Sequence, residues 1–570
     1  MTSVAGAAWL LALDSGTQAS PYTLVAFGAY MIGVFLLGAL SHQLLKRGSF
    51  LKEYFLGDRQ LNAWVLSLTY VATSVSAGSF VGFPSFIYRH GWVMAFWIGG
   101  YMIAGLVSKG VLAKRLNQVS RLSGSITVPD VLRDRFQSPA LGLLGGVFLL
   151  VFLTFNLVAQ FKAGGLIMRQ ASAGVKDTKL YQSARGATTQ ALNNLGFQNE
   201  RIDAKDQDVY GPEYPDYVLG VLIFSVTVIA YTTYGGFWAV TWTDVLQGLM
   251  IVAGAILLMV LALHRIGGLE NATHRLQEID PKLLTGPGPD NFVPLGLAGS
   301  YFILWTIGAM GQPVGMVRLM ACRDTPTLRR SLFMISLYFS LIYFPLVITF
   351  LCARALFPTE YLGQSDRIMP VMALTLTEDW PMLGGVILAA PYAAAMSAVA
   401  GFLLLMTSSL VRDIYQRNWN PRISPRNVKR ITYATTAVVG TVVTVAALRP
   451  PTFLQHLIIF TTGGMACTFL APTVLALYSR RVTKAGALAA MISGFVTVMF
   501  FYVLGWQGIG KENLTGPAKE SAAPVYLFGL DPLVYGMVVS FALGIIVSRF
   551  TSALPKSHVD RYFLRKSIQE

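Results

Sequence analysis

Long apolar runs dominate this sequence and restrict the folds that it can adopt. Stretches such as "VLGVLIFSVTVIAY" and "LMIVAGAILLMVLALH" contain no Asp, Glu, Lys or Arg. A run of about 20 apolar residues is long enough to cross a bilayer as a helix. Only 13% of the residues are charged, against roughly 25% in soluble domains. We therefore expect an all-α polytopic membrane protein.

The apolar runs predict about thirteen transmembrane helices. The predicted spans are 24–45, 63–88, 92–113, 139–168, 216–234, 237–264, 296–320, 331–355, 371–411, 430–448, 452–478, 484–505 and 531–549. The span at 371–411 is too long for one straight crossing, so we expect a pre-helix or a strong tilt there.

The basic residues indicate membrane topology rather than nucleic-acid binding. The net charge of +16 is spread over short connections between spans, where the positive-inside rule places it. "RDIYQRNWNPRISPRNVKR" and "SRRVTK" are rich in Lys and Arg, whereas "RALFPTE" and "LRPP" hold one basic residue each. The basic connections are therefore predicted to be cytoplasmic. With an odd number of spans, the N-terminus lies outside and the C-terminus inside, in a bacterial plasma (inner) membrane.

The polar segments outside the spans complete the predicted organisation. We expect an extracellular tail at 1–20, a cytoplasmic tail at 550–570 and an extracellular insertion at 169–215. The insertion contains a short amphipathic helix around "QSARGATTQALNNLG", and it is either a cap over the outer mouth or a tolerated surface loop. The three cysteines show no metal or disulfide spacing. Without a catalytic constellation, we expect neither an enzyme nor a cofactor.

Two of the predicted spans contain clustered helix breakers. The sequence "ATSVSAGSFVGFP" interrupts the span at 63–88, and "IGAMGQPVG" interrupts the span at 296–320. Backbone groups freed by such breaks cannot face lipid, so they must face protein or a wet cavity. The two spans are five apart, which favours two five-helix inverted repeats, each opening with a discontinuous helix. The repeats would cover 63–264 and 296–478, with peripheral helices at 24–45 and 484–549. The alternative is a pair of ordinary kinks.

Hydroxyl groups gather at the first of these breaks. Thr73, Ser76 and Ser79 lie within it, and hydroxyl and carbonyl oxygens are ligands for small hard cations. We also expect these three hydroxyls to bind the solute, because such groups are tolerated at the bilayer centre if an ion or substrate uses them. In "AAPYAAAMSAVAG", Ala394 and Ser397 are spaced i and i+3 on one helix face. That face could meet the first break, or it could serve Ala-based packing with Ser397 bonding back into its own helix.

Four ordered motifs carry a resemblance to the sodium:solute symporter family. They are "EYFLGDRQLNAWVLSLTYVATSVSAGSFVGFPSFIYRHGW", "YTTYGGFWAVTWTDVLQGLMIVAG", "GAMGQPVGMVRLMACRD" and "AAPYAAAMSAVAGFLLLMTSSLVRDIY". Among family members, the sodium/pantothenate symporters look most similar, notably in "DPKLL" and in the Arg-Asp pair of the third motif. The resemblance implies a LeuT-like fold with a 5+5 inverted repeat and alternating access.

The resemblance also implies a sodium site. By position, two backbone carbonyls fall on Ala72 and Val75, and a third carbonyl and the first hydroxyl fall on Ala394 and Ser397. The second hydroxyl falls on Ala398, which has none. Four oxygen ligands then remain where the family has five, and a water, Thr73 or Ser76 could complete the shell.

Further residues are implicated in the ion route and in solute binding. The resemblance places Asp244 on the inner ion route, although a carboxylate at a helix start is also a favourable cap. It places Trp305, close to Gln312, at an aromatic solute position. Ala309 stands where the proline transporters usually have Tyr, and Phe155 matches a third position. This composition argues against proline as the solute.

Lys162 is the most unusual residue of the spans. A lysine within a span costs about 2.5–3.5 kcal/mol on insertion scales. It could bind a solute carboxylate, with Gln160 as a second polar group, or it could snorkel to the outer surface because it lies late in its span.

We therefore expect a sodium-coupled symporter that imports a small organic solute, possibly a carboxylate, through the lipid bilayer. The alternative is a proton-coupled or degenerate carrier or a sensor, which Ala398 motivates.

Overall fold

The computed structural model describes residues 20–41, 50–196, 213–450, 454–509 and 523–563, and these are almost entirely helical. The predicted tail at 1–20 lies, except for Ser20, outside the described residues. One isolated parallel β-bridge joins Leu61 and Cys322. The first half of the chain contains α2 (Pro21–Ser41), α3 (Phe50–Leu56), α4 (Ala63–Ser74), α5 (Phe83–His90), α6 (Val93–Ser108), α7 (Lys114–Ser123), α8 (Val128–Phe136), α9 (Pro139–Ala171), α10 (Lys179–Asn194), α11 (Tyr214–Ile266) and α12 (Leu269–Ile279).

The second half of the chain contains α13 (Leu295–Thr306), α14 (Pro313–Met320), α15 (Thr325–Leu356), α16 (Ile368–Thr375), α17 (Pro381–Ser408), α18 (Pro425–Ala447), α19 (Leu454–Tyr478), α20 (Lys484–Trp506), α21 (Pro532–Phe550) and α22 (Lys556–Phe563). Several short segments of π-helix and 3-10 helix also matter for the site. They are the π-helical η3 (Gly78–Gly82) and η10 (Ser409–Trp419), and the 3-10 turns η8 (Gly308–Gly311) and η9 (Leu362–Arg367).

Among the described residues, ten helices are long and apolar enough to cross a membrane, or up to 11 if one bent pair counts as a span. The count of thirteen is not confirmed. One reason is α11, whose 53 residues cover two predicted spans with a kink at Gly236 (φ 57°, ψ −150°). Another is the predicted span 296–320, which is divided into the short α13 and α14. The region predicted as one long span at 371–411 is divided into α16 and α17.

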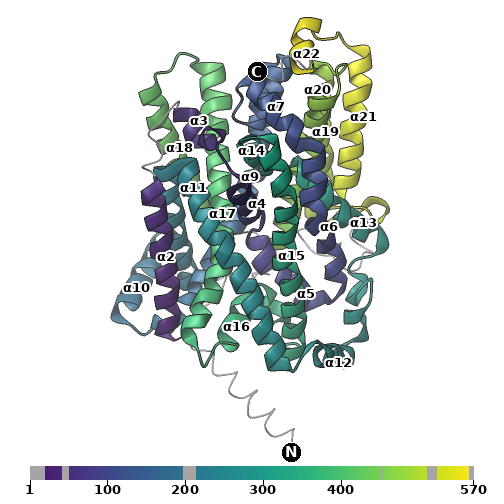
Figure 1. The fold of residues 1–570 in the computed structure, drawn as a ribbon. Coiled ribbons are helices and arrows are strands. Elements are labelled where there is room, and N and C mark those ends of the chain that lie inside the picture. The colour runs from purple at the N-terminus through teal and green to yellow at the C-terminus, as the bar shows by residue number, and fades with distance from the viewer. Residues whose placement is uncertain (1–19, 42–49, 197–212, 451–453, 510–522, 564–570) are drawn as a thin grey trace, which may run out of the picture.

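The connecting segments gather at two ends of the helical bundle. In Figure 1, α3, α7 and α22 lie at the top, and α10, α12 and α16 lie at the bottom. The first group belongs to the connections predicted to be cytoplasmic. In the second group, α10 and α12 belong to connections predicted to be external, whereas α16 lies largely within the predicted span at 371–411. The sequence pattern therefore sorts the connections into the same two sets as the fold does.

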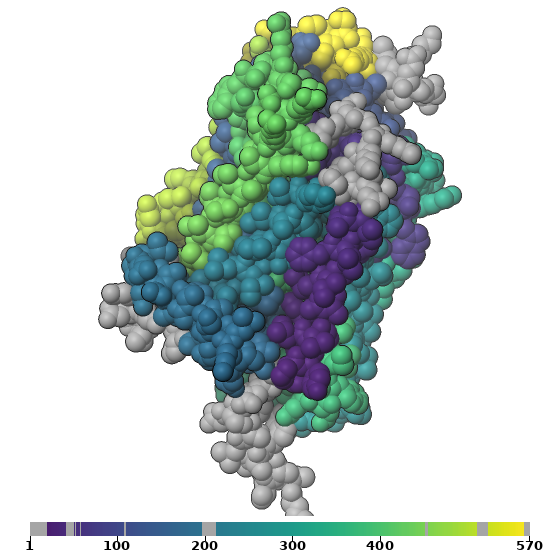
Figure 2. Space-filling model, turned by 90° about the vertical axis from the view of Figure 1, so that its left-hand side faces the viewer, coloured from purple at the N-terminus to yellow at the C-terminus, as the bar shows by residue number. Residues whose placement is uncertain are grey.

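The predicted insertion contains the expected short helix. This helix, α10, docks on the start of α11, where the Tyr181 hydroxyl donates to Asp216 Oδ1 at 2.9 Å and Arg185 Nε lies 3.1 Å from the same oxygen. Figure 2 shows α10 at one end of the surface that α2 and α11 share. Residues 197–212 of the insertion lie outside the described part of the chain.

The helices that carry the functional candidates form the interior of the bundle. The apolar windows of the spans at Pro381–Trp419 and Leu454–Tyr478 are 89% and 94% buried. The corresponding windows of α2, α20 and α21 are 28%, 33% and 22% buried. Because α17 and α19 are almost fully buried and residues 66–73 of α4 are buried as well, their polar groups are shielded from lipid.

Candidate functional site

The first break lies between α4 and η3, near the middle of the bundle. The Asn62 side chain caps the start of α4 by accepting from Val65 N at 2.9 Å. The helix ends at Val75, whose backbone is extended (φ −79°, ψ 100°). The two halves, Ala63–Ser74 and Gly78–His90, are bent by 61°. The predicted discontinuity of this span is therefore real.

Polar side chains bind the backbone groups that the first break frees. Gln160 Oε1 accepts from Ala77 N at 2.8 Å, and Ser76 Oγ accepts from Gly78 N at 3.2 Å. The Tyr101 hydroxyl donates to the carbonyl of Ser74 at 3.2 Å. Such partners are needed because an unsatisfied buried backbone group costs about 1–3 kcal/mol.

Asp244 is the centre of a buried polar network beside this break. Its carboxylate is fully buried and forms an ion pair with Arg318, whose Nη2 lies 2.8 Å from Oδ2. Thr69 and Thr73 donate hydrogen bonds to the same oxygen, and Ser397 Oγ donates to Oδ1 at 2.5 Å. Asp244 lies about two turns beyond the kink at Gly236 and far from either end of α11, so it does not cap a helix start.

The network connects α17 to α4, and these two helices pack closely. A methyl group on Gly401 would lie 2.7 Å from Thr73 Cγ2, and one on Gly248 of α11 would lie 3.8 Å from Ala72 Cβ. All five residues of the predicted sodium site are fully buried: Ala72, Val75, Ala394, Ser397 and Ala398. Because Ser397 bonds to Asp244 rather than to its own helix, the packing alternative does not describe its contacts.

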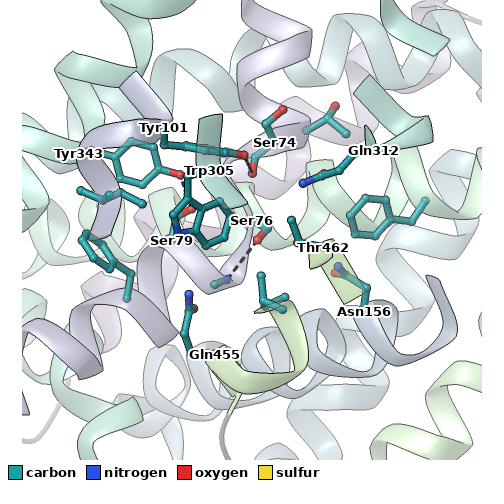
Figure 3. A pocket seen from close by; sticks show the side chains of 16 residues that line it. Ser74, Ser76, Ser79, Tyr101, Asn156, Trp305, Gln312, Tyr343, Gln455 and Thr462 are labelled. Carbon is teal, nitrogen blue, oxygen red and sulfur yellow. Dashed lines mark hydrogen bonds between the residues drawn. The ribbon is translucent and has the colours of Figure 1, made fainter. Parts of the chain in front are cut away.

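A small cavity adjoins the break (Figure 3). Its volume is about 30 Å³, enough for one or two waters. Five of the predicted solute-binding residues line it: Thr73, Ser76, Ser79, Trp305 and Gln312. Around them lie Tyr101, Asn156, Tyr343, Gln455 and Thr462. The cavity thus combines aromatic faces with hydroxyl and amide groups from α4, η3, α6, α9, α13, α15 and α19.

Two polar atoms of the cavity wall are left without partners. Trp305 Nε1 and Gln455 Oε1 are buried and form no hydrogen bond with the described residues. Two other side chains of the wall have partners: Ser79 Oγ pairs with the Tyr343 hydroxyl at 2.7 Å, and Asn156 Nδ2 donates to Thr461 Oγ1 at 2.8 Å. One donor and one acceptor are therefore available to a molecule in the cavity.

Four predicted solute-binding residues do not line this cavity. Phe155 packs toward Phe460, with ring centroids 5.5 Å apart. Ala309 lies in η8. Gln160 accepts a hydrogen bond from the backbone of the first break, at Ala77 N. Lys162 is fully buried, and its Nζ lies 3.6 Å from Asp366 Oδ2 in η9. The snorkelling alternative for Lys162 is wrong because none of the side chain reaches the surface.

The segment around Asp366 also joins α5, the second half of the first broken helix. Ser85 of α5 donates to Ser365 at 2.6 Å, and the Tyr88 hydroxyl donates to the Phe357 carbonyl at 2.6 Å. Nearby, Glu213 is paired with Lys176 at 3.2 Å. Partial burial would raise the pKa of Glu213, but Arg169, Lys176 and Arg367 outweigh it and lower that pKa overall. These contacts therefore link α5, η9 and the insertion.

The second break, between α13 and α14, is also present. Here η8 is followed by Gln312 with an extended backbone (ψ 114°), and Pro313 starts α14. A methyl group on Gly311 would lie 2.5 Å from the Cα of Ala466 in α19. The glycine at 311 thus permits a close backbone approach.

Sequence reasoning missed several residues of the site. Arg318 is the clearest, because a charged residue inside the predicted span at 296–320 is the same signal that singled out Lys162. Tyr101, Tyr343 and Gln455 come from spans that have no breaker or motif at those positions, and only the fold brings them to the cavity.

Comparisons with known proteins identify relatives of this chain. The model of the sodium:solute symporter family matches residues 54–178 and 215–494. The chain is 29% identical to the sodium/pantothenate symporter of Escherichia coli (strain K12), over 93% of this chain and 97% of the relative. It is 30% identical to that of Haemophilus influenzae, over 88% and 93%. The osmoregulated proline transporter OpuE of Bacillus subtilis is 25% identical, over 94% and 96%.

Two solved structures share the fold. A sodium-coupled sialic acid symporter, in a substrate-bound outward-open state, superposes with a TM-score of 0.65 at 18% identity and covers 93% of this chain and 98% of its own. Mhp1, a transporter of the nucleobase-cation-symport-1 family, superposes with a TM-score of 0.51 at 13% identity and covers 90% and 98%.

These neighbours identify the fold as LeuT-like. The relatives are transporters rather than enzymes, and they support sodium-coupled symport of a small solute by an integral membrane protein. With more than half of its length matched by the family model, the chain belongs to the sodium:solute symporter family.

Proposed function

We propose that this protein imports a small organic carboxylate together with sodium, with its N-terminus outside and its C-terminus in the cytoplasm. The observation that carries the proposal is the buried oxygen-rich junction of the α4 break, Asp244 and Ser397. The same break contributes to the cavity that holds an unsatisfied donor and acceptor. Ion and solute would thus bind to opposite sides of one helix break, which couples them.

Sodium would be held by the carbonyls of Ala72, Val75 and Ala394 and by the hydroxyl of Ser397. A serine hydroxyl has one proton and two lone pairs. Because the Ser397 hydroxyl donates its hydrogen bond to Asp244, its lone pairs remain for a cation. Ala398 is fully buried and brings no oxygen, and the Ser76 hydroxyl, beside the break, is our candidate to complete the shell.

Asp244 would serve the inner ion route. A second narrow cavity, of about 20 Å³, lies against Arg318 and is lined by Phe55, Ile126 and Ser408. Phe55 belongs to α3, at the end of the bundle that we assign to the cytoplasm. The Asp244–Arg318 pair would then stand between the sodium site and this exit. Sodium drives the cycle only if it binds the outward-open state more tightly than the inward-open state.

The solute would be a carboxylate with hydrogen-bonding groups, such as the pantothenate of the relatives' names. Trp305 Nε1 and Gln455 Oε1 can each satisfy a polar group of it. We assign its carboxylate to Lys162, which Asp366 holds while the outer side is closed. When η9 and α5 move apart, Lys162 loses this internal carboxylate and becomes available to that of the solute.

Uptake by proteoliposomes tests the proposal. A panel that includes pantothenate and proline is offered with an inward sodium gradient, with a proton gradient, and with neither. We expect accumulation of a carboxylate under the sodium gradient. Uptake driven equally by protons would favour the alternative that Ala398 motivates, and no driven uptake of any solute would favour a sensor.

The assignment of Lys162 has its own test. Lys162→Met should impair the uptake of anionic solutes about tenfold or more, because a buried charged hydrogen bond is lost. Lys176→Met, which alters a half-exposed lysine of the insertion, is the matched control. Equal transport of anionic solutes by both variants would show that Lys162 does not bind the solute. The assignment of the sodium site would be unaffected.

A further inference from the structure

A large groove lies at the end of the molecule that carries α22, and it shares no lining residue with the solute cavity. It is formed where α19 and α21 end and where α22 packs against them, at the top of Figure 1. Its volume is about 940 Å³. Such a volume is within the range of about 300–1,000 Å³ for sites that hold a whole small molecule.

The groove is strongly basic. Arg480, Arg481, Arg549 and Lys556 line it, against one acidic residue, Asp560. Asp560 lies 3.8 Å from Arg480, and this weak pair accounts for one of the four cations. Within the described part of the chain, Arg481, Arg549 and Lys556 enter no ion pair. The groove therefore presents about three uncompensated positive charges.

One wall of the groove is apolar and continues onto a lipid-facing surface. Leu475 and Ile545 contribute to this wall, and Ile545 is 43% exposed. The next residue of α21, Ile546, is 47% exposed, and Phe550 at its end is 85% exposed. Because the apolar window of α21 is only 22% buried, its outer face adjoins acyl chains.

The roof of the groove is a docked helix rather than a loose tail. Val559 and Tyr562 of α22 are buried, and His558 Nε2 lies 3.1 Å from the carbonyl of Arg135 in α8. Arg561 donates to the carbonyl of Leu122 in α7 at 2.8 Å. Topology alone would require basic residues near this membrane surface, but it would not require a walled groove with a fixed roof.

We propose that this groove binds one anionic phospholipid of the cytoplasmic leaflet. Its phosphate would lie among Arg481, Arg549 and Lys556, and its acyl chains would follow the exposed face of α21. Charge complementarity selects an anionic headgroup, and the apolar wall selects a lipid over a free anion. The inference is independent of which solute the protein transports.

The test is lipid binding by the purified full chain, measured by native mass spectrometry and by thermal unfolding. Phosphatidylglycerol, phosphatidylcholine and inorganic phosphate are titrated separately. We expect phosphatidylglycerol to be retained and to raise the unfolding temperature, whereas the other two should not. At about 1 kcal/mol per basic residue, the triple variant Arg481→Gln, Arg549→Gln, Lys556→Gln should bind phosphatidylglycerol about a hundredfold more weakly.

The matched control removes three exposed basic residues at the start of α18, away from the groove: Arg422→Gln, Arg426→Gln and Arg430→Gln. If this control weakens binding as much as the groove variant, the effect is general surface charge and the proposal is wrong. Equal stabilisation by phosphatidylcholine, or by inorganic phosphate, would also overturn it. Neither readout depends on transport, so a failure here leaves the proposed function untouched.

Discussion

The two helix breaks look alike in sequence and differ in their surroundings. The break after α4 is lined by polar partners: Gln160, Ser76 and Tyr101 bind its backbone, and Asp244 lies beside it. The break after α13 packs closely against α19, where Gly311 meets Ala466. The difference teaches that a break alone does not make an ion site. An ion site also needs oxygen-rich neighbours. The second break instead permits close helix packing, and Trp305 and Gln312 beside it line the cavity.

The largest effect should come from the polar side of this comparison. Asp244→Asn leaves the buried Arg318 without its anion, and breaking a buried ion pair costs about 3–5 kcal/mol. We expect sodium-driven uptake to be lost and the unfolding temperature to fall. Asp177→Asn, in the exposed part of the insertion, should change neither. Normal uptake by the Asp244 variant would show that this residue is not part of the ion route.

The packed side should respond differently. Gly311→Ala places a methyl group against the backbone of Ala466, and overpacking of this kind costs about 1–3 kcal/mol. We expect a lower unfolding temperature but an unchanged sodium concentration for half-maximal uptake in the remaining activity. Gly299→Ala, where a methyl group meets nothing within 4 Å, is the control. A shifted sodium dependence would show that the second break also belongs to the ion site.

The breaks and the helical class were predictable because they depend on local properties of the chain. Apolar run length, Gly-Pro clusters and basic connections each act within about one span. The network was harder to predict: Asp244 and Arg318 are far apart in sequence and meet only through tertiary packing. The count of thirteen spans is not confirmed by the length criterion, because α11 continues through Gly236 and α13 is short.

The solute cavity shows the same limit. Thr73, Ser76 and Ser79 were expected because they crowd into one stretch of sequence. Tyr343 and Gln455 had no such signal, since a single polar residue in an apolar helix is commonly satisfied by its own surroundings. Phe155 and Ala309 were assigned to solute binding from the family resemblance. Both lie within the expected spans, but neither lines the cavity.

The smallest predicted effect sharpens the account of the polar break. Ala398→Thr adds a hydroxyl where the family resemblance expects one. If the added ligand strengthens sodium binding by about 0.5–1.5 kcal/mol, the sodium concentration for half-maximal uptake should fall about two- to tenfold. Because Ala398 is fully buried, the smaller Ala398→Ser variant guards against overpacking. If both fold normally and neither changes the sodium dependence, this position does not face the ion.

The most direct test of the central claim is the sodium dependence of uptake by Ser397→Ala in proteoliposomes. Ser397 joins α17 to Asp244 beside the first break, and we assign its lone pairs to sodium. The account predicts that the half-saturating sodium concentration rises about tenfold. Ser225→Ala, which alters a buried serine that bonds only to its own helix, should leave it unchanged. An unaltered sodium dependence in a folded, active Ser397 variant would contradict the proposed ion site.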